Sequence, residues 1–247
     1  MRHLLAVERY KFARSRVVYG ILGCIAVVIG LNLLQSTGNF PVPGFMGIVS
    51  PARWDILLTV WFPIFIAYFV AMEFQNKTIN DALCLGKSRI AVYFAKLTAV
   101  LWHVVLLVVI IMVAKTIGLT IFNGFGEIEP LYFLRHALQA FVLQVFFQFS
   151  VASLFLMAAF IIKTPTLTVI VGIGYTVFTW FGGIMVREFL FGGRFTPYTY
   201  WLPALFNMEA IINTDPQGIL RGSIVSIVWI IATTFIGCAV FKRTDLK

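Results

Sequence analysis

The segment EFQNKTINDALCLGKSRIAVYFAK, residues 73–96, is a long polar interruption in an otherwise strongly apolar chain. It places two acids and four bases between two long apolar runs: Glu73, Asp81, Lys77, Lys87, Arg89 and Lys96. If the flanking runs cross a membrane, this segment must lie at the membrane surface, because charged groups are costly inside the hydrocarbon. It is then free to contact a partner.

The composition of the whole chain is typical of a membrane protein. Of its 247 residues, 60% are hydrophobic and 12% are charged, and the mean hydropathy is +0.94, whereas a soluble domain is about a quarter charged. Runs of roughly 17–25 apolar residues, enough to cross a membrane, occur at 17–34, 56–72, 95–117, 134–162, 167–186 and 219–241. We predict an all-α membrane protein with six transmembrane helices in a single domain, 1–247.

The distribution of the 19 lysines and arginines predicts the orientation. Most of them fall in the N-terminal arm, the 73–96 segment, the turn after the fourth run and the C-terminal tail. The excess of bases in cytoplasmic loops places both termini in the cytoplasm. The net charge of +9 is therefore a signal of topology. Nucleic-acid binding would need a folded soluble module with a basic face, so none is expected.

Two segments outside the six runs have a composition of their own. Residues 2–16 predict a short, moderately amphipathic helix in the membrane interface, attracted to anionic lipid. Residues 187–218 are rich in aromatic residues, glycine and proline, and predict an outer loop with short helices. An aromatic belt at the interface is favoured there over contact with a substrate.

Motifs for catalysis or cofactor binding are absent from the sequence. Gly86-Lys87-Ser88 resembles the end of a phosphate-binding loop, but Asp81 stands where the motif needs its first glycine. His103 and His136 fall at different predicted depths, which argues against haem and favours hydrogen-bonded histidines. We predict no catalytic residue, no metal site and no nucleotide bound by this chain.

Gln144 and Gln148 lie one turn apart in the fourth apolar run. Amides in a membrane need partners, so this pair should face other helices or a cavity. Helix–helix hydrogen bonding and a translocation path are both open interpretations. No acid lies in the middle of an apolar run, which disfavours an ion-coupled carrier.

The 73–96 segment itself contains one apolar stripe. Thr78, Ile79, Ala82 and Leu83 recur at helical spacing, which predicts a short helix that ends near Gly86. Three motifs surround it: Glu8-x-x-Lys11-x-x-Arg14-Ser15, Glu73-x-x-x-Lys77-Thr78-Ile79, and Ser88-Arg89 followed seven residues later by Lys96.

Their order resembles the permease subunits of type-2 ATP-binding cassette exporters, especially those of bacterial lantibiotic and bacitracin immunity systems. Members of these families commonly have glycine where Lys77 stands, and proline near Gly86-Lys87.

The resemblance implies a division of roles. Residues 1–16, with Glu8, Lys11, Arg14 and Ser15, would form a connecting helix, and 73–89 would form a cytoplasmic coupling segment that docks on a separate ATPase. The residues implied in coupling are Glu73, Lys77, Thr78, Ile79, Ala82, Leu83, Ser88 and Arg89. ATP and Mg²⁺ would bind to the ATPase, and a second permease would complete a homodimer or heterodimer in the bacterial plasma membrane. The implied cargo is a hydrophobic or amphipathic peptide. A secondary carrier or channel, and a structural or sensory subunit, remain alternatives.

Overall fold

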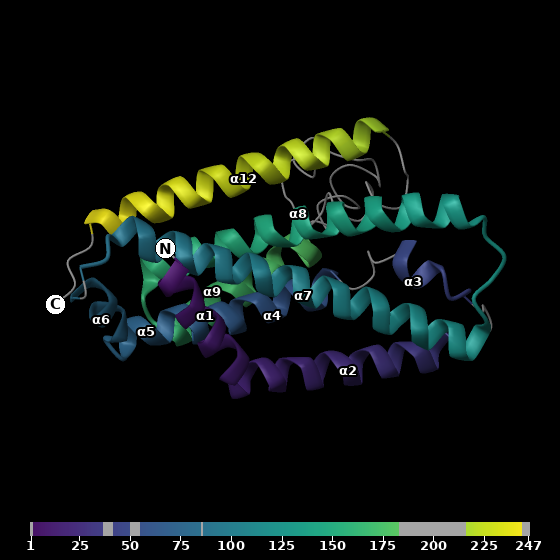
Figure 1. Cartoon of the computed structure of the whole chain (residues 1–247), viewed down its shortest axis with the longest axis horizontal. Coiled ribbons are helices and arrows are strands. Elements are labelled where there is room, and N and C mark those ends of the chain that lie inside the picture. Colours follow the sequence, from purple (N-terminus) through teal and green to yellow (C-terminus); the bar gives the residue numbers. More distant parts are fainter. Residues whose placement is uncertain (1, 37–41, 50–54, 85, 183–215, 244–247) are drawn as a thin grey trace.

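The computed structural model describes residues 2–36, 42–49, 55–84, 86–182 and 216–243. Every element within these ranges is helical (Figure 1), in agreement with the predicted all-α class. Most of the predicted outer segment 187–218 lies outside the described residues, so its short helices stay a prediction.

The six apolar runs are helical wherever the structure describes them, and further short helices lie between them. In chain order the helices are α1 Arg2–Arg14, α2 Arg16–Ser36, α3 Met46–Val49, α4 Asp55–Ile66, the π-helical η2 Ala67–Ala71, α5 Met72–Gln75, α6 Thr78–Cys84, α7 Arg89–Asn123, α8 Pro130–Ile162, α9 Pro165–Val177, the π-helical η3 Phe178–Gly182, and α12 Pro216–Arg243. Helices α7, α8 and α12 are each long and apolar enough to cross a membrane, while the other three runs form shorter apolar helices. The six crossings and their orientation remain predictions.

Helix α8 is the centre of the bundle. It packs along α12 and α7, and also contacts α4 and α9. Large aromatic side chains such as Phe155 and Phe160 fill the interior. Apolar side chains also cover the outside, for example Leu138, Ile231 and Phe235. An apolar exterior of this kind suits a lipid environment.

The α4–α9 pair shows how the bundle compensates for a proline. Pro63 lies inside α4 and has no N–H to donate to the carbonyl of Thr59, four residues earlier. Thr176 of α9 donates its hydroxyl to that carbonyl oxygen at 3.2 Å. Gly172 of α9 allows the close approach, because a Cβ there would overlap the ring of Pro63. The two helices are therefore fitted to each other at this proline.

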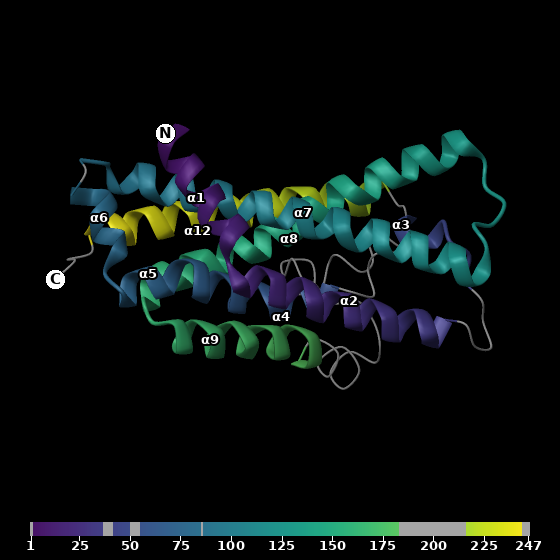
Figure 2. The same cartoon turned by 60° about the horizontal axis from the view of Figure 1, so that its bottom comes forward.

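The segments that the sequence places in the cytoplasm gather at one end of the molecule. Figures 1 and 2 show α1, α6 and the C-terminal end of α12 at the same end of the bundle. Helix α1 packs on α7 there. The candidate site lies at this end.

Candidate functional site

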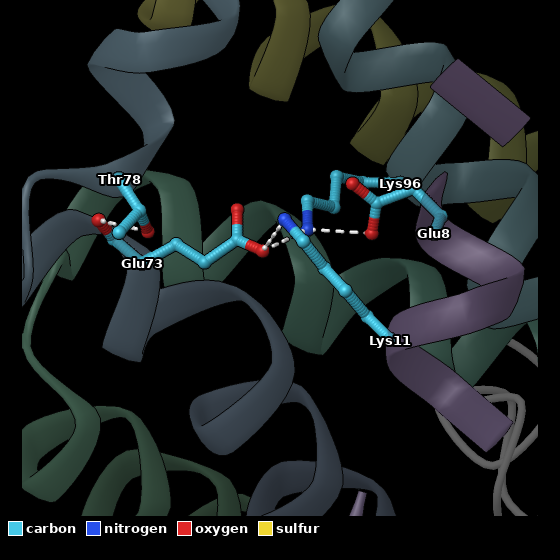
Figure 3. Close-up of polar contacts among 5 residues, drawn as sticks. All are labelled: Glu8, Lys11, Glu73, Thr78 and Lys96. Carbon is cyan, nitrogen blue, oxygen red and sulfur yellow. Dashed lines mark hydrogen bonds and ion pairs between the residues drawn. The ribbon is translucent and has the colours of Figure 1, made fainter. Parts of the chain in front are cut away.

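Four charged side chains from three separate helices meet at this end (Figure 3). Lys96 of α7 donates from Nζ to Glu8 Oε2 of α1 at 2.7 Å and to Glu73 Oε1 of α5 at 2.6 Å. Lys11 of α1 donates to the same Glu73 oxygen at 3.0 Å. We call Glu8, Lys11, Glu73 and Lys96 the ion cluster. It joins α1, α5 and α7 through charge, although its members are far apart in the sequence.

Burial differs sharply among the members of the ion cluster. The Lys96 side chain is 1% exposed and that of Glu73 is 15% exposed, whereas Lys11 is 44% exposed. A buried charge is costly unless it is paired, and removal of one partner leaves the other uncompensated. Removal of Lys96 should therefore destabilise the cluster most. Lys11 lies at the exposed edge, where an ion pair contributes little to stability.

Aromatic rings line the apolar side of the cluster. The ammonium group of Lys96 lies 4.4 Å from the ring centroid of Phe69 in η2, a geometry that favours a cation. Phe69 stacks on Phe65, and Phe65 stacks on His103 at 3.7 Å between centroids. Phe12 of α1 contacts both Phe65 and His103 edge-on. Glu8, Lys11 and Phe12 share one face of α1, so this helix docks through both charge and aromatic contact.

A second aromatic group anchors the residue next to Glu73. Phe74 lies against Phe160 of α8 and Phe241 of α12, with centroids 5.3 and 6.0 Å away. Tyr93 of α7 completes the group through Phe160. The start of the predicted coupling segment is therefore attached to α1 and α7 by Glu73 and to α8 and α12 by Phe74.

The end of the segment is attached as well. Ser88 caps α7, because its hydroxyl accepts the backbone N–H of Ala91 at 3.2 Å. Arg89 donates from Nη1 to the carbonyl oxygens of Phe241 and Lys242, at 3.2 and 3.0 Å. Carbonyls in the last turn of a helix need such donors. Arg89 thus holds the C-terminal end of α12 beside the start of α7.

Between these anchors lies the predicted short helix, α6. Its apolar stripe does not form a free surface: Ile79 is fully buried in the core, and Leu83 is half-buried against it. The side chain of Ala82 lies outside the described part. Thr78 is exposed, and its hydroxyl donates to the Glu73 carbonyl at 3.5 Å. The resemblance implies that this stripe contacts an ATPase, and packing within the chain already covers Ile79 at its centre.

Lys77, at the corner between α5 and α6, has a left-handed backbone with φ of 58°. Only glycine adopts that region without steric cost. Gly86, at the other end of α6, has φ of 75° and supplies the second sharp turn. These two turns fold α6 back onto the bundle, so Ile79 reaches the core.

Two members of the N-terminal motif lie away from the ion cluster. Arg14 donates to the hydroxyl of Tyr10 within α1, at 2.7 Å. Ser15 is the junction between α1 and α2, where its carbonyl accepts the N–H of Val18. These positions fit a structural role, and their predicted part in the connecting helix is untested by any contact.

Gln144 and Gln148 are both buried in α8. Ser153 of the same helix forms a 2.9 Å hydrogen bond with Thr233 of α12, so α8 makes one helix–helix hydrogen bond near these glutamines. Whether the glutamines face a translocation path in an assembled transporter remains a prediction.

The expectation of hydrogen-bonded histidines holds for His136 but fails for His103. Both ring nitrogens of His103 are buried and have no hydrogen-bond partner within the described ranges, and the ring contacts Phe65 and Phe12 instead. His136 is near the start of α8, where Nδ1 lies 2.9 Å from the Tyr132 carbonyl oxygen. No group of three or more His, Cys, Asp or Glu side chains that could hold a metal is found in the described segments.

Lys96 and Phe69 are the site residues that sequence reasoning undervalued. Lys96 is part of a sequence motif, but no partner is predicted for it from that motif. A lysine at the end of an apolar run needs an acidic partner, and the structure supplies Glu8 and Glu73. Phe69 carried no signal, because it lies among many phenylalanines.

Comparison with protein families agrees with the geometry. A family model described as ABC-2 family transporter protein matches residues 4–179, which includes every member of the ion cluster. The chain belongs to the ABC-2 family of transporter proteins. It is accordingly a multi-pass membrane subunit of an ABC transporter, distinct from the ATP-binding subunit with which such permeases assemble. A search of curated proteins gives no match to this chain.

Proposed function

We propose that this chain is the transmembrane subunit of an ATP-driven exporter that moves a hydrophobic or amphipathic peptide outward. A separate ATPase would bind ATP and Mg²⁺, and two permeases, identical or different, would enclose the path. The observation that carries this proposal is the ion cluster, because Glu73 links the coupling segment to α1 and α7 through Lys96.

The mechanism follows from the anchors of the segment. ATP-driven closure of the ATPase would push on α6, and α6 is only a few residues from Glu73 and Phe74. A displacement there must move α1 and α7 through the ion cluster and α8 and α12 through the aromatic group, since all of these contacts are packed. Packed interfaces of this kind transmit small shifts as rigid-body movement.

The placement of acids supports an ATP-driven process over an ion-coupled one. The described helices α7, α8, α9 and α12 contain no acid, and Glu8 and Glu73 lie in α1 and α5 at one end of the bundle. An ion-coupled carrier places acids within the membrane along the ion pathway. The peptide cargo rests on the resemblance to antibiotic-immunity permeases, together with the apolar character of the bundle.

The test is reconstitution with a defined ATPase. The chain is co-expressed with each stand-alone ATP-binding subunit of its source genome, and complexes are placed in vesicles to measure ATP hydrolysis and uptake of labelled amphipathic peptides. We expect a stable complex with peptide-stimulated ATP hydrolysis. Glu73→Gln should retain assembly but lose most of the peptide stimulation, because the link between α5 and Lys96 is weakened. Glu127→Gln, at an exposed acid outside the ion cluster, serves as the matched control.

Each contrary result identifies a different rival. Transport driven by an ion gradient in the absence of any ATPase would show a secondary carrier. A complex that moves lipid or another solute but no peptide would refute only the cargo. Loss of peptide stimulation in Glu127→Gln to the same degree as in Glu73→Gln would remove the special role of the ion cluster.

A further inference from the structure

The outward surface around α6 is basic. Lys77 and Lys87, at the two ends of this helix, are both exposed, and neither side chain has an ion-pair partner in the parts of the chain described here. Arg89, the third base, is turned toward α12. Asp81 is the one acid of residues 75–89, and its side chain lies outside the described positions. The segment therefore carries an excess of positive charge.

The apolar side of α6 is already used within the chain. Ile79 is buried and Leu83 packs against the core, which leaves polar and charged side chains outward on α6 and on the turn before it, among them Asn76, Lys77 and Thr78. A partner that binds here meets charge and hydrogen-bonding groups. Electrostatic complementarity then determines which partner binds and how fast it does so.

Lys77 carries a charged side chain on a backbone in the left-handed conformation. That conformation is unfavourable for a residue with a side chain and costs glycine nothing. One other residue with a side chain shares this conformation in the described ranges, Lys163, with φ of 61° at the C-terminal cap of α8. Backbone strain that persists at an exposed corner points to a use for the side chain.

We propose that the ATPase presents an acidic groove to this segment, and that Lys77 enters the groove while Lys87 contacts its rim. This inference rests on the proposed function and specifies the chemistry of the partner. An anionic membrane is the rival binder of the same bases. The position of α6 favours the ATPase, because α6 lies beyond α1 at the far end of the bundle in Figures 1 and 2.

The two left-handed lysines give a matched pair of variants. Lys77→Gly and Lys163→Gly each remove one positive charge and relieve the same backbone strain, but only the first lies on the coupling segment. We expect both to raise the melting temperature of the detergent-solubilised permease by a similar small amount. Lys77→Gly should weaken binding to the co-expressed ATP-binding subunit by about tenfold, whereas Lys163→Gly should bind as the unmodified chain does.

Salt and a second variant separate charge from backbone. Affinity of the unmodified chain should fall as sodium chloride rises from about 0.05 to about 0.5 M, and the fall should be shallower for Lys77→Gly. Lys77→Gln keeps the strained backbone and removes the charge, so it should bind as weakly as Lys77→Gly. Agreement between these two variants assigns the effect to the lysine charge.

The outcomes distinguish this inference from the proposed function. If the unmodified chain binds none of the ATP-binding subunits, both fail. If it binds one, and Lys77→Gly binds that subunit equally well with the same salt dependence, the acidic groove fails alone. It also fails if Lys77→Gly keeps the ATPase but loses attachment to phosphatidylglycerol vesicles relative to phosphatidylcholine vesicles, because the membrane is then the partner of this lysine.

Discussion

The ion cluster and the Ser153–Thr233 contact both join helices that are distant in the sequence. They differ in how much the folded state loses when one partner is removed. In the ion cluster, Lys96 is buried between carboxylates from two other helices. In the Ser153–Thr233 contact, two neutral hydroxyls meet between α8 and α12, and each also lies within hydrogen-bond reach of a carbonyl of its own helix. Loss of a partner strands a buried charge in the first case and a hydroxyl with another acceptor in the second.

This difference suggests separate purposes. A neutral contact tolerates small changes in helix packing, because a hydroxyl can rotate to its backbone acceptor. A buried ion cluster requires α1, α5 and α7 to stay together, since separation would expose or strand charge. The rigid connection lies next to the predicted coupling segment, where an ATPase would act under the proposed function, and the adaptable one lies within the bundle.

The largest effect is expected for Lys96→Met. The substitution keeps most of the apolar stem of the side chain but leaves Glu8 and Glu73 facing each other in a buried site. The folded state should lose about 3–5 kcal/mol, the range for a broken buried ion pair. The measurement is the melting temperature of the detergent-solubilised protein, with Lys87→Met, at an exposed base, as the control.

A triple variant then tests the cause. Lys96→Met together with Glu8→Gln and Glu73→Gln removes all the buried charge and should recover most of the lost stability. If Lys96→Met alone melts at the same temperature as the unmodified chain, the ion cluster does not stabilise the fold. The proposed difference between the ion cluster and the Ser153–Thr233 contact is then wrong.

The sequence predicted helices over its long apolar runs, because a backbone in a membrane must satisfy its own hydrogen bonds. It did not predict where they end. The run 95–117 covers only part of α7, which extends from Arg89 to Asn123, because its ends are set by the cap at Ser88 and the turn at Gly124, which hydropathy does not report. The π-helical turns η2 and η3 gave no sequence signal, since they arise from packing between helices.

The sequence predicted some members of the ion cluster but not their contacts with one another. Glu8, Lys11 and Glu73 were selected from motifs, but their convergence on Lys96 depends on how α1 and α5 pack against α7, which a single sequence does not encode locally. The stripe at Ile79 shows a different limit of the sequence. Its periodicity correctly predicted a helix with one apolar face, yet a pattern does not state whether that face meets a partner or the chain's own core.

An intermediate effect is expected in the neutral contact. Ser153→Ala or Thr233→Val should each cost about 0.6 kcal/mol, typical of hydrogen bonds between membrane helices. The double variant should cost little more than either single one, because removal of both hydroxyls strands neither. A double-mutant cycle of melting temperatures measures this. Thr233→Val with Ser223→Ala, whose hydroxyl bonds only to its own helix through Ile219, should instead be additive. Additivity in the first pair would mean that the 2.9 Å contact contributes no coupling.

The smallest effect should come from the exposed rim of the ion cluster. Lys11 pairs with the Glu73 oxygen that already binds Lys96, and its side chain is 44% exposed. Solvent and salt screen such a pair, so Lys11→Gln should cost about 0.5 kcal/mol or less at low salt. The difference should vanish near 1 M salt, where the screening length is about 3 Å.

Arg14→Gln is the matched control, since Arg14 is exposed on the same helix and bonds to the Tyr10 hydroxyl. If Lys11→Gln loses as much stability as Lys96→Met, burial does not determine how much each charge contributes to the ion cluster.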